Sequence, residues 1–198
     1  QAGLALLVMA AGVAGMQVAV AAGVAPARPV AWWTALSVAG GLGAFALIRS
    51  GWTRRFADPS IAVPQMLYAL ACAAAAYAIV GPARGGVFPI VMVVLMFGLF
   101  AATPQQMRAV SLYTVALFGL TMGLMAWRRP TVYVPAVEAL HFVMVATMVP
   151  AVSILAARLC LLRQRMRQQR SDLRQALVRI EELATRDALT GLINRRHM

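Results

Sequence analysis

The chain has 198 residues, of which 62% are hydrophobic and 12% charged, and its mean hydropathy is +0.77. A soluble domain carries about a quarter charged residues, so this composition excludes an ordinary soluble protein and indicates an integral membrane protein. The net charge is +12, and the basic residues are all arginine, placed in loops and in a tail. The sequence predicts no folded basic surface with an element that recognises nucleic acid, so we expect no nucleic-acid partner.

Six apolar segments follow one another along the chain. Each has roughly 17–23 residues, which as a helix is enough to cross about 30 Å of hydrocarbon. Because the apolar runs are continuous rather than alternating, we expect helices and not strands. The segments are Gly3–Ala25, Val30–Ile48, Ile61–Val80, Val87–Thr103, Met107–Trp127 and Ala136–Ala157. The predicted fold class is therefore all-α, with a six-helix transmembrane sensor or anchor domain over residues 1–157.

The distribution of arginine predicts how this domain is oriented. Six crossings place both ends of the domain on the same side of the membrane. On that side we expect Arg49, Arg54, Arg55 and Arg108, together with Arg158, Arg163, Arg165, Arg167 and Arg170. On the opposite side we expect Arg28, Arg84, Arg128 and Arg129. The positive-inside rule then predicts a multi-pass protein of a bacterial inner membrane with a cytoplasmic C-terminus, and it is the tail that decides this.

A different pattern begins after Ala157. Mostly apolar residues recur at alternating intervals of three and four, with a polar or small residue at two of these positions and with Arg and Gln on the outside. The positions are Leu159, Leu162, Met166, Gln169, Leu173, Ala176, Ile180 and Leu183. This heptad seam predicts a coiled-coil signalling helix over residues 158–186 that pairs with a second copy in parallel. The alternative is a single amphipathic helix lying on anionic lipid.

The last residues carry a polar motif that follows this helix. The stretch LATRDALTGLINRR (183–196) resembles the entry to a GGDEF domain, the catalytic domain of diguanylate cyclases, which typically begins close to D-x-L-T-G-L-x-N-R-R. The matching residues are Asp187, Leu189, Thr190, Gly191, Leu192, Asn194, Arg195 and Arg196. Ile193 departs from the usual Pro at a turn position. Residues 187–198 are then the start of an α/β GGDEF domain that is truncated here.

The resemblance implies a function for the intact protein. A diguanylate cyclase condenses two GTP to cyclic di-GMP with Mg²⁺, each subunit of a dimer presenting one GTP. The family's catalytic, guanine-binding and metal-binding residues come after this motif, so we assign no catalytic residue, no metal ligand and no cofactor within this chain. The chain is predicted to be a membrane input and dimerisation region that responds to a membrane or periplasmic signal. The alternatives are a membrane anchor that senses nothing and a fragment of a transporter or channel.

A candidate sensing site lies in the sixth segment. Glu138 and His141 are the only acidic residue and the only histidine within the predicted crossings, and ionisable groups there usually face a partner or water. Met144 and Met148 are predicted to share their helix face. Arg128 or Arg129 is the predicted partner of Glu138. Three interpretations stay open: an interfacial ion pair with methionine as filler, a pocket for a small ligand or proton, and a metal or haem site.

Two further features concern helix geometry. Pro150 removes a backbone hydrogen bond and is predicted to act as a hinge between the candidate site and the signalling helix. Gly119 and Gly123 form a GxxxG pattern, at which helix backbones can approach closely.

Overall fold

The computed structural model describes residues 2–55 and 61–185. The regular elements of these residues are all helices: α1 (Ala2–Ala21), α2 (Ala27–Arg49), η1 (Trp52–Arg55), α3 (Ala62–Val80), η2 (Gly81–Val87), α4 (Phe88–Ala101), α5 (Pro104–Arg128) and α6 (Pro135–Thr185). This confirms the predicted all-α class for the described part of the chain. The predicted GGDEF-entry motif, Asp187–Arg196, lies outside the described residues.

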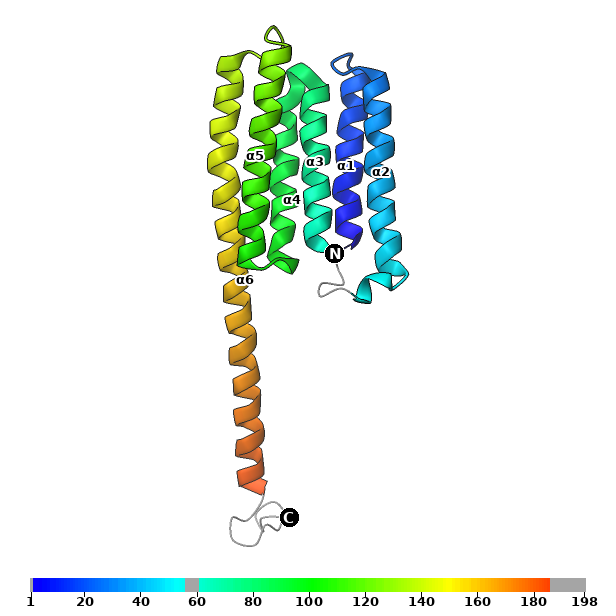
Figure 1. The fold of residues 1–198 in the computed structure, drawn as a ribbon. Coiled ribbons are helices and arrows are strands. Elements are labelled where there is room, and N and C mark those ends of the chain that lie inside the picture. Colours follow the sequence, from blue (N-terminus) through cyan, green and yellow to red (C-terminus); the bar gives the residue numbers. More distant parts are fainter. Residues whose placement is uncertain (1, 56–60, 186–198) are drawn as a thin grey trace. The chain divides into compact units, whose positions relative to one another are not determined.

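The chain divides into two units, one ending at Ala157 and one beginning at Arg158. In the first unit, α1 to α5 and the first part of α6 lie side by side and alternate in direction (Figure 1). α3 is the central helix, since it packs against α1, α2, α4 and α5. Its buried face includes Leu70, Ala74 and Tyr77. Much of the rest of the bundle surface is apolar and exposed, for example Trp32 and Leu120, as expected of side chains that face lipid.

Among the residues that the structure describes, four stretches are long and apolar enough to cross a membrane: 27–49, 62–98, 104–128 and 135–180. The second of these contains α3 and most of α4, which run in opposite directions on the two sides of η2 (Figure 1). α4 has 14 residues, and a helix of that length spans only about 21 Å. α1 contributes a shorter apolar stretch, Ala5–Ala21. The membrane character is thus supported, while the number of six crossings stays a prediction.

Local sequence explains where the helices begin and end. Gly23 adopts a positive φ of 70° just after α1, and its N–H donates to Val20 O at 2.9 Å. At the start of α5, Thr103 and Gln106 form a reciprocal capping box, with Pro104 as the first helical residue. These are the features that stop and start helices at low cost, because they satisfy backbone groups that the helix itself leaves unpaired.

The second unit consists, within the described residues, of the continuation of α6 through Thr185. Every residue from 161 to 180 is exposed in the single chain. The apolar seam residues within this range are exposed too, including Leu173, which is 63% exposed, and Ile180, which is 62% exposed. The helix is confirmed as a helix, whereas its pairing with a second copy stays a prediction.

The GxxxG pattern of α5 provides a matched test of helix packing. A Cβ atom added to Gly119 would lie 2.8 Å from Phe142 Cε2 on α6, whereas one added to Gly123 meets nothing within 4 Å. We expect Gly119→Ala to lower the free energy of unfolding by about 1–3 kcal/mol through overpacking. Gly123→Ala should leave it unchanged or raise it by up to about 1 kcal/mol, since alanine is the better helix former. Unfolding of both variants in mixed micelles measures the difference; equal effects would contradict the close contact at Gly119.

Candidate functional site

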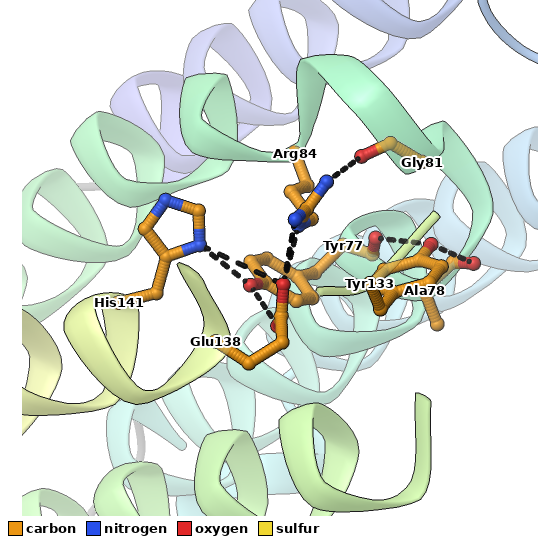
Figure 2. Close-up of polar contacts among 7 residues, drawn as sticks. All are labelled: Tyr77, Ala78, Gly81, Arg84, Tyr133, Glu138 and His141. Atoms are coloured by element: carbon orange, nitrogen blue, oxygen red, sulfur yellow. Dashed lines mark hydrogen bonds and ion pairs between the residues drawn. The ribbon is translucent and has the colours of Figure 1, made fainter. Parts of the chain in front are cut away.

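A buried ion pair lies at the end of the bundle where α3 ends and α6 begins, which we call the η2 end (Figure 2). Glu138, in the first turn of α6, is 4% exposed, and Arg84, in η2, is 6% exposed. Arg84 Nη2 lies 2.7 Å from Glu138 Oε1, and Arg84 Nε donates to the same oxygen at 2.7 Å. Taking either charge out of water alone would be very costly, so each makes the burial of the other possible.

Two further polar groups complete the cluster on the α3 and α6 sides. The Tyr77 hydroxyl donates to Glu138 Oε2 at 2.6 Å, so both carboxylate oxygens are engaged. The same hydroxyl lies 2.9 Å from His141 Nδ1. His141 Nδ1 is 4.0 Å from Glu138 Oε1, one helical turn along α6. The carboxylate therefore connects η2, α3 and α6 through hydrogen bonds strengthened by its charge.

Arg84 is also held from its other side. Its Nη1 donates to Gly81 O at 2.9 Å, and its guanidinium carbon lies 4.8 Å from the centre of the Tyr133 ring. The Tyr133 hydroxyl in turn donates to Ala78 O at 2.8 Å. Burial raises the pKa of the Tyr133 phenol, which keeps it protonated as this donor. The arginine is thus fixed by a carboxylate, a carbonyl and an aromatic face together.

The local sequence brings Arg84 back over the end of α3. Gly81 has φ 62°, a conformation that favours glycine, and it ends α3 and opens the short helix η2. Around the cluster the neighbours are rings: Phe88 lies 5.8 Å and Phe118 5.9 Å from the centre of Tyr77. These rings exclude water from the ion pair, which strengthens its electrostatic attraction.

The structure brings two of the predicted site residues together and separates four others from them. Glu138 and His141 are both in the cluster. The predicted pairing of Glu138 with Arg128 or Arg129 is wrong: the carboxylate pairs with Arg84, and the other two arginines are exposed. The nearest arginines in sequence are not the nearest in space, because the turn after α3 carries Arg84 inward.

Met144 and Met148, predicted to share the helix face of Glu138, do not lie on its buried face. Met144 is 40% and Met148 47% exposed, whereas Val145 is 2% exposed and Val149 fully buried. The reason is helical geometry: at about 100° per residue, positions 7 and 11 residues after Glu138 fall within about 20° of it. Positions 6 and 10 residues away lie well off that direction. Both methionines therefore belong to the outer surface of α6.

Two other predictions concern α6 and metals. α6 continues as a helix through Pro150, so the hinge at this residue stays a prediction. The part of the chain that the structure describes contains no group of three or more His, Cys, Asp or Glu placed to hold a metal ion. The metal or haem interpretation of Glu138 and His141 stays a prediction.

Sequence reasoning missed three members of the cluster: Tyr77, Arg84 and Tyr133. A signal for two of them was present. The predicted topology puts the end of the third segment and the start of the sixth on one side, so Tyr77 and Arg84 share a membrane level with Glu138. A buried carboxylate in an apolar segment requires a cation, and Arg84 stands in the tight turn GPARGG on that side.

The described helices and this cluster suggest a helical membrane protein with a buried, paired ionic site at one end of its bundle. Comparison of the chain with protein-family models, with curated proteins and with solved structures found no match.

Proposed function

We propose that this chain is the membrane input and dimerisation region of a diguanylate cyclase in a bacterial inner membrane. The observation that carries the proposal is the stretch Asp187–Arg196, which resembles the entry to a GGDEF domain and directly follows the amphipathic part of α6. Cyclic di-GMP formation requires two GTP-bearing domains face to face. A helix that both leaves the membrane domain and pairs with its twin can set that geometry.

The course of α6 supports an input role. One helix of 51 residues begins in the Glu138 cluster and continues to Thr185. The cluster therefore lies on the same helix whose exposed seam, including Leu173 and Ile180, is proposed to form the dimer. Such control needs only a few kcal/mol between two arrangements, because 1.4 kcal/mol changes an equilibrium tenfold.

The proposed topology has six crossings and a cytoplasmic C-terminus. It is supported by the alternating directions of α1 to α6 (Figure 1) and by the concentration of arginine after Ala157. In this topology the η2 end of the bundle faces the periplasm. The cluster would then meet a signal from outside the cytoplasm, and its charged residues lie at one end rather than along a transport path.

The test is the product of the intact protein. Purified in detergent and given GTP with Mg²⁺, it should form cyclic di-GMP, identified by mass spectrometry. The chain Gln1–Met198 is the control and should form none, because the family's catalytic motifs follow the entry motif. An intact protein that binds neither GTP nor cyclic di-GMP and makes no product would reject the proposal.

A further inference from the structure

The hydrogen bonds of the cluster fix the position of one proton. Glu138 accepts from Arg84 and from Tyr77, and an ionised carboxylate has no proton to donate. Tyr77 has a single hydroxyl proton, which is used in its bond of 2.6 Å to Glu138 Oε2. The contact of 2.9 Å between the Tyr77 oxygen and His141 Nδ1 then requires the histidine to be the donor. His141 therefore carries its proton on Nδ1.

This assignment leaves Nε2 of the neutral ring with a free lone pair. Figure 2 shows Nε2 on the side of the ring away from Glu138 and Tyr77. Within the described residues Nε2 has no hydrogen-bond partner, and the His141 side chain is 17% exposed. The ring is held in place by edge contacts with Tyr77 and with Phe88, whose centres lie 6.1 and 5.1 Å away. A fixed, partly exposed acceptor is thus presented outward.

We propose that His141 Nε2 is a proton-binding site through which this bundle responds to the pH at its η2 end. The inference rests on the proposed function for its physiological meaning, but not for its chemistry. A proton is the fitting occupant, because imidazole is the side chain that titrates in the ordinary physiological range. A metal ion would need further ligands, and the described residues offer no such group around His141.

Protonation changes the charge balance of the cluster. The charged and titratable groups facing His141 are Tyr77 from α3, Arg84 from η2 and Glu138 from α6, while α4 presents the Phe88 ring. When His141 is neutral, the positive charge of Arg84 and the negative charge of Glu138 cancel. With imidazolium there are two cations for one carboxylate, and His141 Nδ1 already lies 4.0 Å from Glu138 Oε1. The two cations compete for Glu138, so protonation favours an arrangement in which α6 and η2 separate.

The test uses histidine NMR on the chain Gln1–Met198 in detergent, labelled with ¹⁵N in the imidazole ring. The chain has two histidines, and His197→Gln leaves only His141. At high pH the spectrum should show the Nδ1–H tautomer, and lowering the pH should convert it to imidazolium. Tyr77→Phe removes the acceptor and should shift the neutral ring towards Nε2–H. Tyr133→Phe, which removes a bond to Ala78 but none to His141, should leave the tautomer unchanged.

An Nε2–H tautomer in the parent chain, or a ring that does not titrate between about pH 5 and 8, would overturn the proposal whether or not the intact protein makes cyclic di-GMP. The second arm uses the intact protein. His141→Gln should make cyclic di-GMP output insensitive to external pH, while Met144→Gln, on the exposed face of α6, should preserve the parent's response. An unchanged response in His141→Gln would also overturn the proposal.

Discussion

Replacing Arg84 with alanine should lower the free energy of unfolding of the bundle by about 3–5 kcal/mol, because it leaves a buried carboxylate without its cation. Glu138 is 4% exposed, and Arg84 supplies both of the charged contacts to its Oε1. Glu138→Ala should lower the free energy of unfolding by a similar amount, because it leaves the buried guanidinium of Arg84 without its carboxylate. Interhelical hydrogen bonds in membrane proteins contribute on average about 0.6 kcal/mol, so an effect of this size would identify the ion pair as the dominant polar contact.

The measurement is SDS-induced unfolding in mixed micelles, with a control and a rescue. Arg128→Ala is the control, since Arg128 is an exposed arginine at the end of α5 and should cost less than about 1 kcal/mol. The double variant Arg84→Met with Glu138→Met should recover most of the loss, because an apolar pair of similar volume replaces a buried ion pair at little net cost. If Arg84→Ala unfolds like Arg128→Ala, the buried pair does not form in the folded bundle.

Much of the fold could be predicted from the sequence because the signals that start and end each helix lie within a few neighbouring residues. Continuous apolar runs indicate helices, and Gly81 and Pro104 interrupt them by backbone chemistry that acts within a few residues. The predicted segment boundaries therefore lie within a few residues of the helices at most ends. The extent of α6 was also predictable, because the seam follows the sixth apolar segment directly and predicts a helix that runs straight out of it, as the structure has it.

The site was predictable only in part, because the packing of the helices determines which residues interact with Glu138 and His141. Glu138 and His141 could be identified from the sequence because an ionisable group in an apolar helix is energetically unfavourable and requires a compensating neighbour. Which neighbour it has depends on how α3, η2 and α6 meet, and the contact between Tyr77 and Glu138 joins residues 61 apart in the sequence. Proximity in sequence favoured Arg129, nine positions away, over Arg84. The positive φ of Gly81 starts the turn that carries Arg84 inward, and the spacing along the chain gives no sign of it.

Replacing Leu173 with glutamate should reduce the cyclic di-GMP activity of the intact protein at least tenfold. Leu173 lies at the centre of the proposed seam, is 63% exposed in the single chain, and has Met166 and Ile180 one heptad away on either side. In a parallel dimer the two copies of this residue would face each other, and two buried carboxylates would repel and lose hydration. A loss of pairing energy of about 1.4 kcal/mol already lowers the dimer constant tenfold.

The matched control is Arg174→Glu, which introduces the same side chain one residue along the same exposed helix but outside the seam. It should retain most of the activity, even though it changes the charge of the helix by more than Leu173→Glu does. Activity is measured at matched protein levels in membranes.

Single cysteines at positions 173, 174 and 180 report the contact between the two helices directly. Those at 173 and 180 should cross-link with their twins far more readily than the one at 174. Equal loss of activity in both glutamate variants, or equal cross-linking at all three positions, would favour a helix that lies on the membrane surface without pairing, because such a helix has no seam to distinguish position 173 from position 174.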